Sequence, residues 1–150
     1  MNIGDKIPEV LGHDQNGKTI KASDFAGRKL ALYFYPKDST PGCTAEACSL
    51  RDSYHELMAK GYEIVGVSPD SEASHRRFIE KNELPFPLIS DVDHKLAEEM
   101  GVWGEKSMYG RKYFGIFRTT FLVDPDGIIE HIFGPKDIKT KTHASQILSL

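Results

Sequence analysis

Residues 30–48 read LALYFYPKDSTPGCTAEAC, and this stretch joins the two patterns that decide the fold. The first six residues, Leu30 to Tyr35, are all apolar, which is typical of a strand buried on both faces inside an α/β sheet. Pro36 ends the run, and Thr40 and Pro41 suit the N-cap and the first position of a helix. The stretch therefore predicts a central strand that leads directly into a helix, at the sheet edge where sites of open α/β folds tend to lie.

Strand and helix patterns alternate along the rest of the chain. Short apolar runs predict further strands at 63–67, 86–89, 119–123 and 128–133. The last two are separated by the turn sequence DPDG, so they should form a hairpin. Segments without Gly or Pro predict helices at 44–60, 71–82 and 93–100, followed by a short final helix within 141–150.

The predicted elements indicate an α/β fold in one domain, residues 1–150. Asn16-Gly17 is a tight-turn signal and predicts a small N-terminal β-hairpin over residues 9–21. Alternating strands and helices predict a central mixed sheet flanked by helices. With 39% apolar residues in 150, the chain can build a core, which excludes intrinsic disorder.

Charge and hydropathy exclude several classes of partner. The net charge of -3 argues against a nucleic-acid binder, which usually has a basic excess. The one basic stretch, Lys106 to Arg118, is typical of a solvated loop. The longest apolar run, six residues, is far below the ~20 that a membrane-spanning helix needs. The first ten residues lack a secretory pattern, so we expect a cytoplasmic protein without a membrane partner.

The only two cysteines, Cys43 and Cys48, fit neither a disulfide scaffold nor a zinc site. Their spacing is wider than most zinc-finger pairs, and no second Cys or His pair stands at ligand spacing. The six histidines are scattered, and we interpret each as a surface or partly packed residue. We therefore expect no metal and no cofactor.

Cys43 falls in the first turn of the predicted helix, close to free backbone N–H groups and the positive end of the helix dipole. This position favours the thiolate, which is the nucleophilic form. Cys48 lies about 140° around the helix, and the two Cα atoms are about 8.6 Å apart. A disulfide needs roughly 4.4–6.8 Å, so the two sulfurs can bond only if the helix opens. The alternative is that both cysteines are inert, packed apolar residues.

The motif Pro36-x-x-x-Thr40-x-x-Cys43 resembles the active-site signature of the peroxiredoxins. Cys48, five residues after Cys43 in PGCTAEAC, is similar to the Q-type branch, also called bacterioferritin comigratory protein. The likeness extends over essentially all 150 residues through Gly4-Asp5-x-x-Pro8, Phe25-x-Gly27, Gly66-Val-Ser68 and Arg118-x-Thr120-Phe121.

The resemblance implies a thioredoxin-like fold and an antioxidant, thiol-dependent peroxidase that reduces hydrogen peroxide and organic hydroperoxides. Cys43 would be the peroxidatic nucleophile and become a sulfenic acid, and Cys48 would resolve it as an intramolecular disulfide. Thioredoxin or a similar dithiol would then reduce that disulfide. Because the pair is intramolecular, we expect a monomer.

Three further residues receive roles from the same resemblance. Arg118 would supply a permanent positive charge to the thiolate, and Thr40 would offer its hydroxyl to the thiolate or the peroxide. Pro36 has no acid–base chemistry and would shield the pocket from water.

Two other functions compete with this interpretation. A disulfide reductase of the thioredoxin type usually carries Cys-x-x-Cys, which this chain lacks. A redox-responsive binding or chaperone protein would instead open the cysteine helix to expose Leu50, Tyr54 and Leu57 to a client. Repeated loss of hydroperoxide distinguishes the peroxidase from such a binder.

Overall fold

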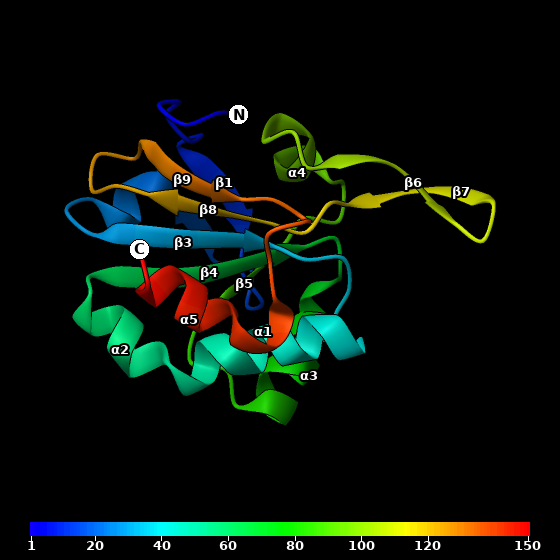
Figure 1. The fold of residues 1–150 in the computed structure, drawn as a ribbon, viewed down its shortest axis with the longest axis horizontal. Helices are drawn as coiled ribbons and strands as arrows, with labels where there is room; N and C mark the ends of the chain where they lie inside the picture. The colour runs from blue at the N-terminus through cyan, green and yellow to red at the C-terminus, as the bar shows by residue number, and fades with distance from the viewer.

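The computed structural model describes residues 1–150 and places five strands in one central sheet (Figure 1). Their order across the sheet is β5-β4-β3-β8-β9. Strands β3, β4 and β5 are parallel, whereas β8 runs antiparallel to both β3 and β9. Their bounds are β3 Lys29–Phe34, β4 Tyr62–Ser68, β5 Leu88–Ser90, β8 Thr119–Val123 and β9 Ile129–Phe133. The predicted apolar strand is therefore the central one, and the predicted hairpin is β8–β9.

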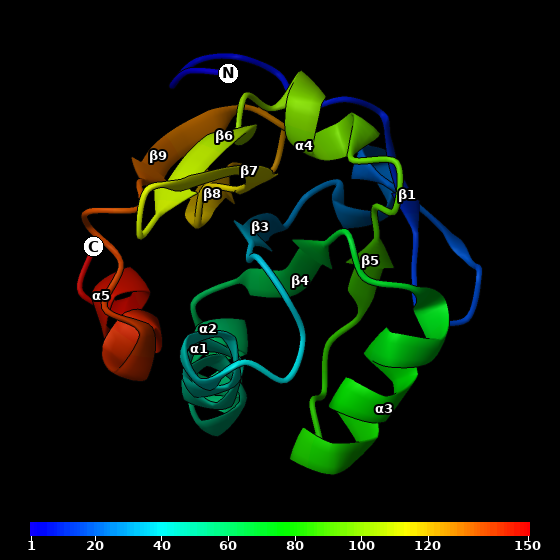
Figure 2. The same ribbon diagram turned by 90° about the vertical axis from the view of Figure 1, so that its right-hand side faces the viewer.

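Alternation along β3 and into Tyr35 divides the core into two layers. Ala31, Tyr33 and Tyr35 face a cluster that includes buried residues of four helices: α1 (Pro41–Asp52), α2 (Tyr54–Ala59), α3 (Glu72–Asn82) and α5 (His143–Leu148). The even-numbered residues from Leu30 to Phe34 face the other cluster. That layer contains the short helix α4 (Lys95–Glu99) and the hairpin of β1 (Val10–His13) and β2 (Thr19–Lys21) (Figure 2).

This arrangement confirms the predicted fold class, a central mixed sheet flanked by helices with an N-terminal hairpin. Two short 3₁₀ helices, Ala22–Phe25 and Thr140–Thr142, complete the secondary structure.

The predicted helix at 44–60 is two helices that begin earlier. Helix α1 starts at Pro41 with Thr40 as its N-cap residue, as the Thr-Pro pair predicted. Ser53 separates it from α2, and serine is a poor residue for a helix interior because its hydroxyl competes for backbone hydrogen bonds. None of the helices has the length and apolar content that crossing a bilayer requires.

The basic stretch predicted as a loop is a β-hairpin instead. Strands β6 (Trp103–Met108) and β7 (Arg111–Ile116) pair antiparallel and project away from the main sheet (Figure 1). Tyr109 and Gly110 join them with φ values of 52° and 77°, the backbone of a two-residue hairpin turn. Residues along both strands are largely exposed, so the period-two burial signal that reveals a strand is missing.

Gly66 offers a test of how tightly the sheet packs. It lies between Tyr33 and Leu88 across three parallel strands, and a Cβ there would sit 2.7 Å from Leu88 Cδ2 and 2.9 Å from Tyr33 Cε1. We expect Gly66→Ala to lower the free energy of unfolding by about 1–3 kcal/mol, because both neighbours are buried and cannot yield. Urea unfolding measures this loss.

The matched control is Gly115→Ala in β7. Its Cβ would meet Lys106 Cδ at 3.3 Å, and the flexible lysine chain can move aside. A change within about 0.5 kcal/mol is expected there. Equal losses at the two positions would contradict the packing argument.

Candidate active site

Cys43 lies in the first turn of α1, just after the loop that leaves the central strand. Its side chain is only 2% exposed and packs with Ala47 and Leu50 of the same helix. Arg118, in the short connection between β7 and β8, donates a hydrogen bond from Nη2 to Cys43 Sγ at 3.3 Å. A fixed positive charge therefore meets the sulfur near the helix N-terminus, where free backbone N–H groups add to the positive potential.

Glu46 holds Arg118 in this position. Its carboxylate accepts a hydrogen bond from Arg118 Nη1 at 2.6 Å through Oε1. Glu46 itself is fully buried. Since the guanidinium binds sulfur with one nitrogen and carboxylate with the other, its plane is set from two sides.

Glu46 was not predicted from the sequence, although its position contained the signal. It follows Cys43 by three residues on the same helix, and residues at that spacing lie on one face. Burial raises the pKa of Glu46 to about 7, against the opposing effect of Arg118. Its second oxygen, Oε2, has no hydrogen-bond donor, which is the environment expected of a carboxyl that is protonated part of the time.

His143 extends the site to α5 and corrects the interpretation of each histidine as a surface or partly packed residue. It is fully buried, with Nε2 at 3.8 Å from Glu46 Oε2. The same nitrogen lies 2.8 Å from Thr120 Oγ1, and Nδ1 lies 2.9 Å from Gln146 Oε1. Since the Gln146 oxygen can only accept, Nδ1 carries the proton and Nε2 accepts from Thr120. Burial lowers the pKa of His143, which agrees with this neutral form.

Thr40 and Pro36 lie in the loop between β3 and α1, at the sequence distance from Cys43 that the motif requires. Both are half-buried. Thr40 occupies the N-cap position, but its side chain makes no capping hydrogen bond. Instead its hydroxyl donates to the Lys37 carbonyl at 2.8 Å, which leaves the lone pairs of the oxygen free to accept.

Cys48 is half-buried and packs toward α3. Its Sγ lies 3.8 Å from Asn82 Oδ1, and Arg51 Nη1 donates to the Asn82 carbonyl at 2.8 Å. Both cysteines are free thiols, and the continuous helix α1 spans them. A disulfide between them therefore requires that α1 open and that Cys48 leave Asn82.

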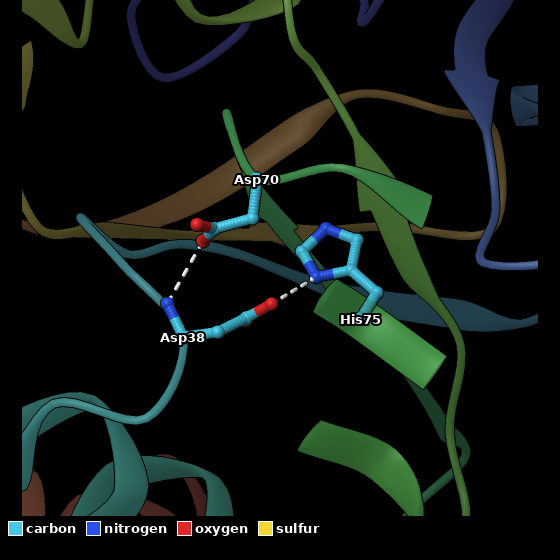
Figure 3. A group of neighbouring side chains, drawn as sticks. All are labelled: Asp38, Asp70 and His75. Carbon is cyan, nitrogen blue, oxygen red and sulfur yellow. Dashed lines mark hydrogen bonds and ion pairs between the residues drawn. The ribbon is translucent and has the colours of Figure 1, made fainter. Parts of the chain in front are cut away.

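One group of side chains has the composition of a metal site. Asp38, Asp70 and His75 bring ligand atoms within 4.8 Å of one another (Figure 3). However, both ring nitrogens of His75 are already hydrogen-bonded, to Asp38 Oδ2 and to the Ile89 carbonyl. The nitrogen atoms that would bind a metal are therefore occupied by hydrogen bonds within the protein.

The raised pKa of Glu46 predicts a pH dependence of stability. The folded state holds the proton up to about pH 7, whereas the unfolded state releases it near 4.5. The stabilising contribution is complete below pH 4.5 and is lost as pH rises to about 7. We expect the stability of the wild type relative to Glu46→Gln to fall by up to about 3 kcal/mol over that window.

Urea unfolding of both proteins at several pH values between 4.5 and 7 checks this. The control is Glu56→Gln, which removes an exposed carboxylate from α2 and should leave the difference from wild type constant. A constant difference for Glu46→Gln would show that its carboxyl is not buried in the way described.

Comparison with known proteins places this site in a family. Residues 3–132 match the family model described as AhpC/TSA family. The chain is 46% identical over 149 residues to peroxiredoxin Bcp of Escherichia coli (strain K12), covering 99% of this chain and 94% of the relative.

Two solved structures agree with this assignment. PrxQ of Xylella fastidiosa superposes with a TM-score of 0.89 at 35% identity, covering 99% of this chain and 94% of that one. The bacterioferritin comigratory protein of Xanthomonas campestris gives 0.85 at 36% identity, covering 97% and 96%. The chain therefore belongs to the AhpC/TSA family and is a peroxiredoxin of the Bcp or Q type, an enzyme that reduces peroxides through thiol chemistry.

Proposed function

We propose that Cys43 is the peroxidatic cysteine, and the observation that carries this assignment is the Arg118 guanidinium on its sulfur. The Cys43 thiolate attacks the terminal oxygen of the hydroperoxide, and the O–O bond breaks. The electron pair of that bond leaves with the other oxygen, which takes up a proton to give an alcohol or, from hydrogen peroxide, water. The sulfur is oxidised to a sulfenic acid.

The surroundings of Cys43 suit this displacement. Arg118 stabilises negative charge on the sulfur at the start and on the departing oxygen as the O–O bond lengthens. Thr40 accepts a hydrogen bond from the peroxide, since its own proton is given to Lys37. Pro36, without a backbone donor, covers the sulfur from water.

We propose Cys48 as the resolving cysteine. Its thiol attacks the Cys43 sulfenic acid, a disulfide forms and water leaves. Since α1 separates the two sulfurs, its first turns open before this step and close again after reduction. The whole cycle then takes place within one domain and one chain, which suits a monomer.

A dithiol protein of the thioredoxin class is the proposed reductant. It attacks the disulfide to form a mixed disulfide and then releases the two reduced cysteines of this chain. The proposed substrates are hydrogen peroxide and organic hydroperoxides. The structure of the Xanthomonas campestris relative was described for its alkyl peroxide reduction activity, which supports the organic substrates.

Cysteine variants test the two assignments directly. Cys43→Ser should lose peroxide consumption because no nucleophile remains. Cys48→Ser should complete one oxidation and then stop with thioredoxin, because the sulfenic acid has no internal partner. Hydroperoxide loss with thioredoxin and its reductase, together with mass analysis of the oxidised cysteine, measures both.

The two cysteine variants serve as controls for each other, because each keeps one thiol in the same helix. Peroxide consumption by Cys43→Ser would overturn the nucleophile assignment. Normal cycling of Cys48→Ser with thioredoxin would remove Cys48 as the resolving residue.

Arg118 variants separate charge from geometry. Arg118→Ala should lower kcat/KM for hydrogen peroxide by about 10²-fold, the usual cost of losing one preorganised donor at a site of developing charge. Arg118→Lys keeps the charge but cannot bind sulfur and carboxylate together. Its kcat/KM should therefore lie between those of the wild type and Arg118→Ala. Iodoacetamide alkylation of Cys43 should slow in the same order, and equal alkylation rates in all three proteins would place Arg118 outside the site.

A further inference from the structure

A buried hydrogen-bond network lies behind the loop that supplies Thr40 and leads to Cys43. Asp38, in the middle of this loop, is 5% exposed, and His75 of α3 is fully buried. Asp38 Oδ2 lies 2.7 Å from His75 Nδ1 and accepts from Ser74 Oγ at 2.8 Å. Asp38 Oδ1 accepts from the Tyr35 hydroxyl at 2.6 Å. Figure 3 shows the carboxylate of Asp38 directed at the imidazole.

The hydrogen-bond partners of His75 fix its protons. Nε2 lies 2.9 Å from the Ile89 carbonyl, which can only accept, so Nε2 carries a proton. A second proton lies between Nδ1 and Asp38 Oδ2, because two facing lone pairs at 2.7 Å would repel. Tyr35 and Ser74 both donate to the same carboxyl group. His75 is therefore hydrogen-bonded at both ring nitrogens, and Asp38 is its partner at Nδ1.

The backbone of the loop is held as well. Asp70 Oδ2, which also accepts from Ser68 Oγ at 2.6 Å, accepts from the Asp38 backbone N–H at 2.8 Å. Asp38 is thus tied to β4 through Asp70 and to α3 through His75 (Figure 3).

The loop needs such ties because its conformation is strained. Ser39 has φ of 62°, a left-handed backbone that costs a residue with a side chain about 1–2 kcal/mol. Ser39 stands between the tied Asp38 and Thr40, whose hydroxyl is oriented by the Lys37 carbonyl. Releasing Asp38 would let the loop relax and turn both the Thr40 hydroxyl and the start of α1.

We propose that Asp38 and His75 form a positioning pair for the peroxidatic site, holding the 36–40 loop so that the Thr40 hydroxyl and the Cys43 sulfur face the peroxide together. The inference rests on the proposed roles of Thr40 and Cys43. What Asp38 supplies is a fixed geometry rather than a charge at the reacting atoms. An isosteric side chain that keeps the hydrogen bonds should therefore replace it.

Asp38→Asn and Asp38→Ala test this. In Asp38→Asn the amide can donate to His75 Nδ1, which then loses its proton, while the amide oxygen still accepts from Tyr35. In Asp38→Ala the bonds to His75, Tyr35 and Ser74 are all lost. We expect Asp38→Ala to slow the oxidation of Cys43 by hydrogen peroxide about tenfold to a hundredfold, since misplacement of about 1 Å can cost that much. Asp38→Asn should stay within about threefold of the wild type.

Asp14→Ala is the matched control for losing a buried aspartate. Asp14 is 7% exposed and accepts from Asn16 N and Lys18 N in the turn of the β1–β2 hairpin. This variant should have a lower thermal unfolding temperature than the wild type, but its Cys43 should be oxidised by hydrogen peroxide at the wild-type rate. A folded Asp38→Ala protein with the wild-type rate, or a folded Asp38→Asn protein as slow as Asp38→Ala, would overturn the positioning role.

Nitrogen NMR of His75 checks the pair itself. Nε2 should be protonated in both the wild type and Asp38→Asn, and the Nδ1 signal should change in Asp38→Asn, where the amide donates to this nitrogen. An unchanged Nδ1 signal would overturn the pair, because Asp38 would then not be bonded to that nitrogen. Failure of the proposed function can be told apart from failure of the positioning role. If the proposed function is wrong, peroxide leaves Cys43 unoxidised in the wild type as well as in the variants.

Discussion

The site depends on one guanidinium that joins a sulfur to a carboxylate. Arg118 reaches Cys43 with one nitrogen and Glu46 with the other, and the two acceptors stand three residues apart on α1. A cation held only by a thiolate could swing away when the sulfur is oxidised and loses its charge. Glu46 binds Arg118 independently of the sulfur, so in the proposed cycle it would keep Arg118 in the site for the next peroxide. Gly42 permits this approach, since a Cβ there would lie 3.3 Å from the guanidinium.

The same helix has to satisfy two opposite requirements. Folded, α1 presents Cys43 to Arg118 and packs it with Ala47 and Leu50 against the sheet. Folded, it also keeps Cys48 on the side of α3, next to Asn82. In the proposed cycle, peroxide reduction requires the closed helix and disulfide formation requires the open one. Opening the first turns of α1 would take Cys43 out of its buried contacts, whereas the contacts of Cys48 and Arg51 with α3 are partly exposed.

Much of the fold follows from local pattern, and much of the site does not. The apolar run at 30–35 identified the central strand because a strand covered on both faces must be apolar throughout. Thr40-Pro41 placed the start of the helix, and the resemblance to the peroxiredoxins paired Arg118 with Cys43, which the hydrogen bond between them matches. Glu46 and His143 were missed because a buried charged or polar residue looks like a surface residue in sequence, and its partner comes from a distant element. The hairpin β6–β7 was missed because neither of its faces is consistently buried.

The packing of Cys43 links electron transfer to folding. Forming the disulfide removes that side chain, and the helical turns beside it, from a well-packed interior. The oxidised chain therefore loses packing contacts that stabilise the folded reduced chain. By thermodynamic linkage, whatever strengthens the closed helix makes its dithiol form harder to oxidise and its disulfide a stronger oxidant, by about 30 mV for each 1.4 kcal/mol. In the proposed cycle, the refolding of α1 therefore favours reduction of the disulfide, in addition to the thiol–disulfide exchange itself.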